Sequence, residues 1–126
     1  MAKSYKILIV EDEDINYMYL ETFLLDMNLN LDISHALDGQ EGVDFVKKDS
    51  SFDLILMDLR MPEMDGFKAT KIIKELAPQI PIVVQTAFIS PDDRRLAWEA
   101  GCNDFISKPI SEDTLRLILE KFILKK

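Results

Sequence analysis

The stretch Ile7-Leu8-Ile9-Val10-Glu11-Asp12-Glu13-Asp14 passes from four consecutive apolar residues to four consecutive acidic ones. A short, continuous apolar run is typical of a strand buried on both faces, and the abrupt change indicates that the strand ends at a polar edge. From residue 15 to residue 27, apolar side chains recur with the three-and-four spacing of a helix, and Asp14 is the expected N-cap. The stretch therefore predicts a buried strand followed directly by a helix.

The same unit of a strand and a helix recurs along the rest of the chain. Further strands are expected at 31–36, 53–58, 80–87 and 104–107, and further helices at 40–47, 67–76, 91–100 and 111–124. Gly101 follows the fourth helix where helices commonly end, and Ser111 is the expected N-cap of the last helix. Such short intervals favour direct crossovers between parallel strands. The predicted fold is α/β, a flavodoxin-like (βα)5 doubly wound parallel sheet of five strands.

The composition is that of one folded domain covering residues 1–126, with 48% hydrophobic residues, 4 Gly and 5 Pro. The net charge of −8 repels phosphate backbones and anionic lipid surfaces, so direct binding to nucleic acid or membranes is not expected. A single cysteine excludes an internal disulfide, and the apolar runs are far shorter than the roughly 18 residues that span a bilayer. We expect a cytoplasmic domain, or the cytoplasmic part of a membrane-bound protein.

Polar side chains follow the predicted strands at the carboxyl edge of the sheet, where open α/β sheets bind their ligands. Glu11 and Asp12 follow the first strand, and Asp58, Thr86 and Lys108 lie at the ends of the third, fourth and fifth strands. Three neighbouring carboxylates repel one another unless a cation lies among them, and hard oxygen ligands without a His or Cys cluster favour Mg²⁺. The hydroxyl and the ammonium suit a tetrahedral anion, so phosphoryl transfer is the predicted chemistry.

The motifs around these residues resemble the receiver domain of two-component response regulators. The resemblance covers essentially the whole chain and is carried, in order, by residues 7–13, residues 54–66, Thr86-Ala87 and Ser107-Lys108-Pro109. It implies that Asp58 accepts a phosphoryl group from a phosphohistidine and thereby switches partner interactions. It also implies that the domain is not an enzyme with a separate substrate, because it catalyses only its own phosphorylation and dephosphorylation.

The same resemblance assigns the metal ligands and the groups that bind the phosphoryl oxygens. Mg²⁺ would be held by four groups: Glu11, Asp12, Asp58 and the main-chain carbonyl of Arg60. Thr86 and Lys108 would bind the phosphoryl oxygens, and the peptide bond before Pro109 would be cis.

Thr86 and Phe105 would form the switch that responds to phosphorylation. Many receivers have a tyrosine where this chain has Phe105, so switching here has to rely on packing without a hydroxyl. Two large side chains, Arg60 and Phe88, are expected to flank the phosphoryl group and limit the entry of water.

Two other functions use similar chemistry or a similar fold. A haloacid-dehalogenase-like phosphotransferase also has an Asp nucleophile with Mg²⁺, but it requires a second Asp two residues later, where this chain has Arg60. A flavin-binding electron carrier requires a Ser/Thr/Gly-rich phosphate loop after the first strand, where the acidic residues 11–14 would repel the flavin phosphate. Both functions are disfavoured.

The resemblance implies a histidine kinase or a histidine phosphotransfer protein as the partner. On the first helix we expect Met18, Thr22 and Leu25 to face the sheet, which leaves a second apolar stripe for docking of the phosphohistidine helix: Tyr17, Leu20 and Leu24. Residues 101–110 look especially like receivers attached to hybrid histidine kinases, which favours the receiver of such a kinase over a stand-alone regulator.

A second surface is expected on the face formed by the fourth helix, the fifth strand and the fifth helix. If Leu96, Ala97 and Ala100 face the sheet, Trp98 is exposed and can form an aromatic patch with Phe105. A weak homodimer through this face is a further expectation.

His35 and Cys102 are the single histidine and the single cysteine of the chain. His35 falls within a predicted strand, which favours a partly buried packing residue over a catalytic base. Cys102 has no basic neighbour in the sequence, so we expect an unreactive thiol.

Overall fold

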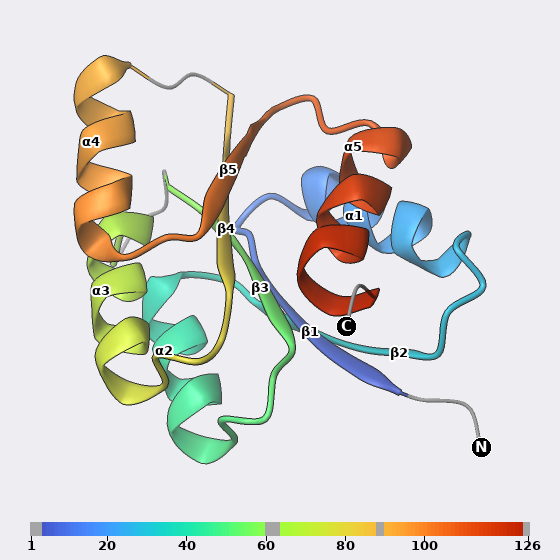
Figure 1. Cartoon of the computed structure of the whole chain (residues 1–126), viewed down its shortest axis with the longest axis horizontal. Coiled ribbons are helices and arrows are strands. Elements are labelled where there is room, and N and C mark those ends of the chain that lie inside the picture. The colour runs from blue at the N-terminus through green and yellow to red at the C-terminus, as the bar shows by residue number, and fades with distance from the viewer. Residues whose placement is uncertain (1–3, 60–63, 88–89, 125–126) are drawn as a thin grey trace.

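The computed structural model describes residues 4–59, 64–87 and 90–124 and contains one parallel sheet in the strand order β2-β1-β3-β4-β5 (Figure 1). The strands are β1 (Tyr5–Val10), β2 (Leu31–Ala36), β3 (Leu54–Asp58), β4 (Ile82–Thr86) and β5 (Asp104–Ser107). The helices are α1 (Asp14–Leu25), α2 (Gly39–Lys48), α3 (Gly66–Leu76), α4 (Pro91–Ala100) and α5 (Glu112–Leu119), and a π-helical turn at Glu120–Leu124 continues α5. This order and the parallel pairing confirm the predicted flavodoxin-like fold.

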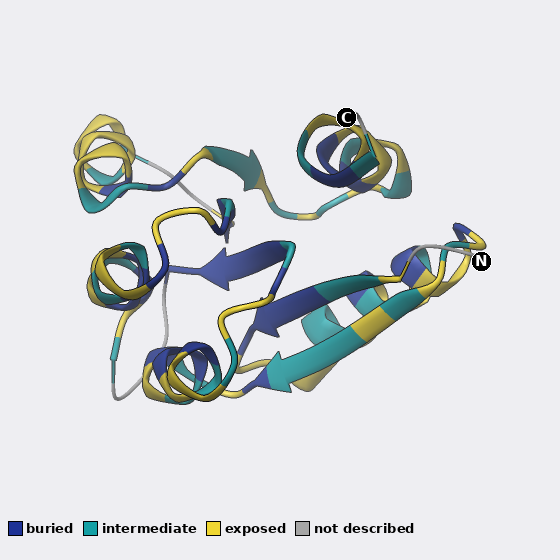
Figure 2. Cartoon of the chain, turned by 60° about the horizontal axis from the view of Figure 1, so that its bottom comes forward, coloured by how far each residue is buried: buried dark blue, intermediate teal, exposed yellow. Residues whose placement is uncertain are grey.

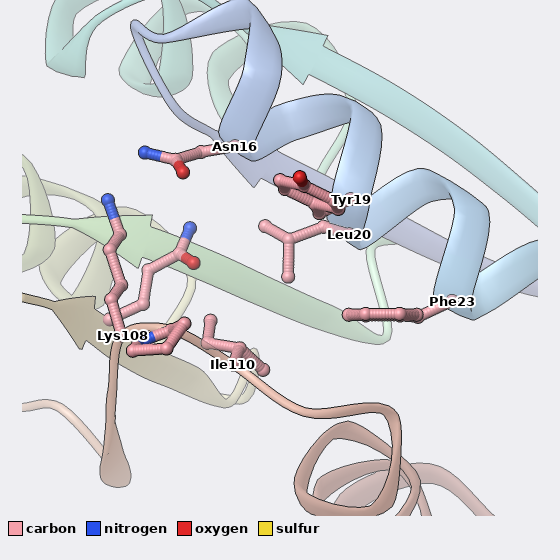
Figure 3. A pocket seen from close by; sticks show the side chains of 8 residues that line it. Asn16, Tyr19, Leu20, Phe23, Lys108 and Ile110 are labelled. Atoms are coloured by element: carbon pink, nitrogen blue, oxygen red, sulfur yellow. The ribbon is translucent and has the colours of Figure 1, made fainter.

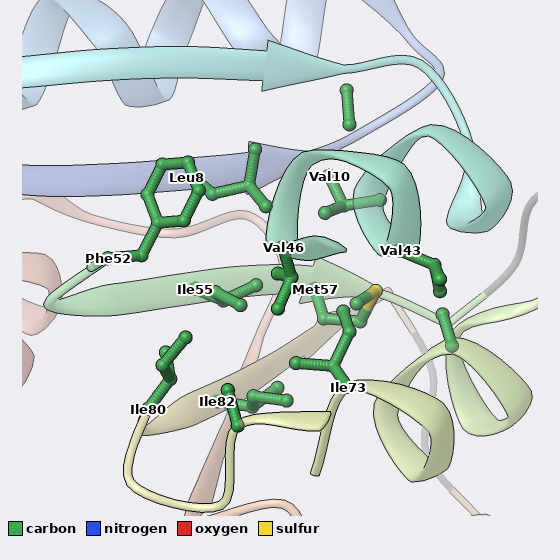
Figure 4. Close-up of a cluster of buried hydrophobic side chains, with 13 residues drawn as sticks. Leu8, Val10, Val43, Val46, Phe52, Ile55, Met57, Ile73, Ile80 and Ile82 are labelled. Atoms are coloured by element: carbon green, nitrogen blue, oxygen red, sulfur yellow. The ribbon is translucent and has the colours of Figure 1, made fainter. Parts of the chain in front are cut away.

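The helices form two layers, with α2, α3 and α4 on one face of the sheet and α1 and α5 on the other (Figure 1). Strands β3 and β4 are buried along their whole length, as Figure 2 shows, because both of their faces are covered. Successive side chains of a strand point to opposite faces, so Ile55 and Met57 pack under α2 and α3 (Figure 4) while Leu54 and Leu56 pack under α1 and α5. The sheet therefore lies between two apolar layers, which fix the position of its carboxyl edge.

The predicted element boundaries are mostly correct within a few residues, and the fourth helix is correct at both ends. Gly101 adopts φ 107 after α4, and the Ser111 side chain accepts a hydrogen bond from the Thr114 N–H at the start of α5, as predicted. The prediction of Asp14 as an N-cap is wrong, because α1 begins at Asp14 and the cap position is Glu13. Among the described residues, no helix is long and apolar enough to cross a lipid bilayer.

The predicted orientation of α1 is also wrong. Leu20 and Leu24 are buried against the sheet, with exposed fractions of 2% and 0%, and Tyr17 is half-buried beside them. The exposed apolar side chains of α1 are instead Ile15 (68%), Met18 (60%), Tyr19 (61%) and Leu25 (61%). The helix is apolar on more than one side, so its periodicity does not determine which side packs against the sheet. The predicted docking stripe is therefore core.

On α4 the prediction is correct in part. Ala97 is buried and Trp98 is 49% exposed, but Leu96 is exposed rather than packed on the sheet. The helix is short and lies at the edge of the sheet, so few of its side chains are buried. Ala97 packs in one apolar cluster with Cys102, which lies just beyond the end of the helix.

Candidate functional site

Three carboxylates meet at the carboxyl edge of the two neighbouring strands β1 and β3. Glu11 and Asp12 directly follow β1, and Asp58 is the last residue of β3. One oxygen of each carboxylate lies within 4.8 Å of the others. Glu11 and Asp58 are buried, whereas Asp12 is exposed. The strand order reverses between β1 and β3, which is where open α/β sheets leave a binding crevice.

Local hydrogen bonds fix the position of Glu11. Its main-chain N–H donates to the Ala36 carbonyl at 3.0 Å, and its side chain accepts from the Glu13 N–H at 3.2 Å. The ring of His35 donates from Nε2 to the Glu11 carbonyl oxygen at 2.8 Å and lies flat on the ring of Tyr17, with 3.7 Å between the centroids. His35 is thus a half-buried packing residue, as predicted. Sequence reasoning missed that it packs against the main chain of the acidic cluster, which follows from the pairing of β1 with β2.

Lys108 supplies a cation to this cluster. Its Nζ lies 3.0 Å from Oε1 of Glu11 and 3.5 Å from Oδ2 of Asp58. Burial alone would lower the pKa of Lys108, but the charges and hydrogen bonds of Asp58 and Glu11 outweigh it and raise the pKa above its ordinary value. Lys108 therefore stays protonated. The peptide bond before Pro109 is cis, as the resemblance implies.

A cavity of about 450 Å³, which we call the acceptor cavity, opens over Asp58. Its walls bring together residues from the ends of three strands and from α1: Glu13, Asn16, Asp58, Thr86, Ala87, Lys108 and Pro109. Glu13 and Asn16 were not predicted to line this cavity. Their position in the first turn after β1 could have indicated it, because this turn lies at the carboxyl edge of the sheet. Gly66 packs directly against the main chain of Asp58. A larger residue is excluded there, because a Cβ atom would clash with the carbonyl oxygen of Asp58. Arg60 and Phe88, expected as a ligand and as flanking residues, lie outside the described residues.

The donor set of the cavity fits a hard dication. Three carboxylate oxygens converge, two of the carboxylates are buried, and no soft sulfur ligand is among them. Mg²⁺ prefers such oxygen ligands and usually keeps several waters, for which the exposed side of Asp12 leaves room. Glu11, Asp12 and Asp58 are the described residues that would hold the ion.

The aromatic patch of Trp98 and Phe105 forms as predicted, with 5.2 Å between the ring centroids. The guanidinium of Arg94 lies 4.3 Å from the centroid of the Phe105 ring. Phe105 is half-buried between α4 and the sheet, next to Val84 on β4. Cys102 lies beneath this face, and burial together with the charge of Asp104 raises its pKa to about 11, which agrees with an unreactive thiol.

Comparisons with known proteins agree with this arrangement. The profile described as "Response regulator receiver domain" matches residues 7–120. Over 124 residues the chain is 39% identical to the osmosensing histidine protein kinase SLN1 of Saccharomyces cerevisiae, covering 94% of this chain and 10% of that protein. Over 123 residues it is 37% identical to the two-component response regulator ORR41 of Oryza sativa, covering 97% of each. The chain thus spans only about a tenth of the length of this histidine protein kinase.

Two solved structures are similar throughout. The receiver domain of the sensor histidine kinase PA1611 from Pseudomonas aeruginosa, which has a magnesium ion in its active-site cleft, superposes with a TM-score of 0.86 at 32% identity and covers 98% of this chain and 100% of its own. A Saccharomyces cerevisiae receiver, that of the response regulator Ssk1 in complex with the histidine phosphotransfer protein Ypd1, gives a TM-score of 0.82 at 32% identity and covers 97% and 90%. The fold, the acidic edge and the matched profile together show that this chain belongs to the response regulator receiver domain family.

Proposed function

We propose that Asp58 is the phosphoryl acceptor of this receiver domain and that Mg²⁺ is required for the transfer. The observation that supports this most directly is the position of Asp58, whose buried carboxylate lies within 4.8 Å of those of Glu11 and Asp12 and lines the acceptor cavity together with Thr86 and Lys108. Receiver domains belong to two-component systems and phosphorelays, so the donor is a phosphohistidine of a kinase or of a phosphotransfer protein.

In the proposed reaction, an oxygen of Asp58 attacks the phosphorus in line with the bond to the imidazole nitrogen. The O–P bond forms while the N–P bond breaks, and the imidazole leaves. The protein contributes mainly positioning and charge neutralisation to such a transition state. Lys108 is already within 3.5 Å of Asp58, and Thr86 lines the same cavity, so both can donate to the transferred oxygens. Mg²⁺ would supply further positive charge to these oxygens.

The direct test is to incubate the chain with Mg²⁺ and a small acyl phosphate and to locate the modification by mass spectrometry. We expect it on Asp58 alone, because Asp58 is the one of the three clustered carboxylates that lines the acceptor cavity. Modification of Glu11 or Asp12 instead, or equal modification without Mg²⁺, would refute the proposal.

We propose a histidine phosphotransfer protein or a histidine kinase as the partner, docking on the exposed face of α1. This face, Ile15, Met18 and Tyr19, replaces the stripe expected from the sequence, since Leu20 and Leu24 are buried. It lies beside the acceptor cavity, because Asn16 of the same helical turns lines that cavity. The complex of the Ssk1 receiver with Ypd1 supports a partner of this kind. Apolar side chains this exposed are favoured anchors in interfaces.

Ile15→Ala is expected to slow phosphoryl transfer from the protein donor about tenfold, because an interface anchor that loses its side chain costs more than 1 kcal/mol. Phosphorylation by a small acyl phosphate should be unchanged, since Ile15 is exposed and does not line the acceptor cavity. Leu25→Ala is the matched control: it is as exposed as Ile15 but about 15 Å further along the helix. Equal slowing by both variants would argue against docking at this end of α1.

We propose that phosphorylation draws the Thr86 hydroxyl toward the phosphoryl group and lets Phe105 move inward. Because Phe105 touches Trp98, the only tryptophan, the indole should report this movement. Mg²⁺ with beryllofluoride, a mimic of the phosphoryl group, is expected to change the tryptophan fluorescence, and Thr86→Ala should abolish the change. A spectrum that stays constant at saturation would exclude the switch. Whether this face also forms a weak homodimer stays a prediction.

A further inference from the structure

A second cavity, of about 280 Å³, lies between α1 and the segment that follows β5. We call it the α1 chamber. Tyr19, Leu20 and Phe23 of α1 face Lys108 and Ile110 across it, as Figure 3 shows. Asn16, Gln85 and Pro109 complete its lining. The walls are mostly apolar, which is typical of sites for small molecules rather than of water-filled clefts.

The polar group of the chamber that stands out is the amide of Gln85. This residue lies on β4 and is fully buried, and neither Oε1 nor Nε2 has a hydrogen-bond partner among the described residues. An unpaired buried donor and acceptor are costly, so an amide without a partner indicates that something is missing from its surroundings. No hydrogen bond to a described residue holds the side chain in its present rotamer. Gln85 lines the chamber, so a turn of its amide toward the chamber would break no hydrogen bond to a described residue.

We propose that the α1 chamber binds a small, neutral, planar amide. Its carbonyl would accept a hydrogen bond from Nε2 of Gln85 and its N–H would donate to Oε1, while its flat body packs between the α1 side chains and Ile110. The volume of about 280 Å³ suits a single ring with an amide substituent.

The charges of the chamber and of the whole chain favour a neutral ligand. Lys108 is the one charged side chain among the described residues of the lining, and its ammonium is engaged by Glu11 and Asp58 rather than directed at a ligand. The net charge of −8 also disfavours anions. A ligand that pairs with Gln85 gains two hydrogen bonds, whereas an apolar ligand of the same shape leaves the amide unpaired.

The test uses the whole chain and two probes of nearly the same shape, benzamide and acetophenone. Benzamide offers a donor and an acceptor, and acetophenone offers the acceptor alone. In titrations followed by NMR, we expect benzamide to shift the signals of Gln85, Leu20 and Ile110 and to bind about tenfold more tightly than acetophenone, because only benzamide satisfies both amide atoms.

Gln85→Leu should remove the preference for benzamide, whereas Gln79→Leu, which alters an exposed glutamine elsewhere, should keep it. The comparison of the two probes on the unaltered chain decides the question even if Gln85→Leu folds poorly. Equal affinity for both probes, or shifts confined to residues outside the chamber, would overturn the proposal. Neither readout depends on phosphorylation, so failure here is distinct from failure of the acceptor assignment.

Discussion

Asp58→Asn is expected to reduce phosphoryl uptake to background with both a protein donor and a small acyl phosphate. The substitution keeps the shape of the side chain but replaces the attacking carboxylate by an amide, which is a far weaker nucleophile. Of the three clustered carboxylates only that of Asp58 lines the acceptor cavity, so we expect neither Glu11 nor Asp12 to take over. The measurement is the yield and rate of modification, followed by mass spectrometry.

The fold of Asp58→Asn should be intact, since the change removes one of three mutually repelling carboxylates and leaves Lys108 paired with Glu11. Circular dichroism and a thermal melt are the controls. Uptake at the rate of the unaltered chain would show that the acceptor has been wrongly assigned.

Lys108→Ala is expected to separate the binding of metal from the binding of the phosphoryl group. Beryllofluoride in the presence of Mg²⁺ should bind about tenfold to a hundredfold more weakly, the loss expected for a charge-assisted hydrogen bond. Mg²⁺ alone should bind at least as tightly as before, because Lys108 is a cation that lies 3.0 Å from Glu11 and 3.5 Å from Asp58 and opposes the ion. Both affinities are measurable by titration.

Lys47→Ala, which removes a charge from the exposed side of α2, is the matched control and should change neither affinity. In the unaltered chain, beryllofluoride should not bind without Mg²⁺, since the acidic cluster repels an anion. Parallel weakening of Mg²⁺ and beryllofluoride binding in Lys108→Ala would indicate damage to the fold and not the loss of a phosphoryl contact.

The fold and the acidic site could be predicted from the sequence because their signals are local. An apolar run that stops at a carboxylate marks both a buried strand and a group at the carboxyl edge, as at Val10-Glu11 and Met57-Asp58. The crossovers are too short for another topology, so residues that end different strands had to meet. Thr86 and Lys108 line one cavity with Asp58 for the same reason.

The orientation of α1 and the surroundings of single side chains could not be predicted in this way. Leu20 and Met18 are equally apolar in the sequence, and only the packing of α1 on β1, β3 and α5 decides that Leu20 is buried. The contact of His35 with Glu11 depends on strand register. The amide of Gln85 has no hydrogen-bond partner within the described part of the chain, and no sequence signal predicts this, because a glutamine in a strand usually reaches water or a partner.

The placement of the acceptor cavity on the ends of three strands has a consequence during protein synthesis. Asp58 and Thr86 end β3 and β4, and Lys108 follows β5, so Lys108 is the last of the three to be synthesised. A nascent chain that has not yet released β5 from the ribosome has the acceptor carboxylate but lacks the ammonium. A chain truncated before β5 lacks the Lys108 contact to Asp58, so we expect such a product to accept phosphoryl groups poorly.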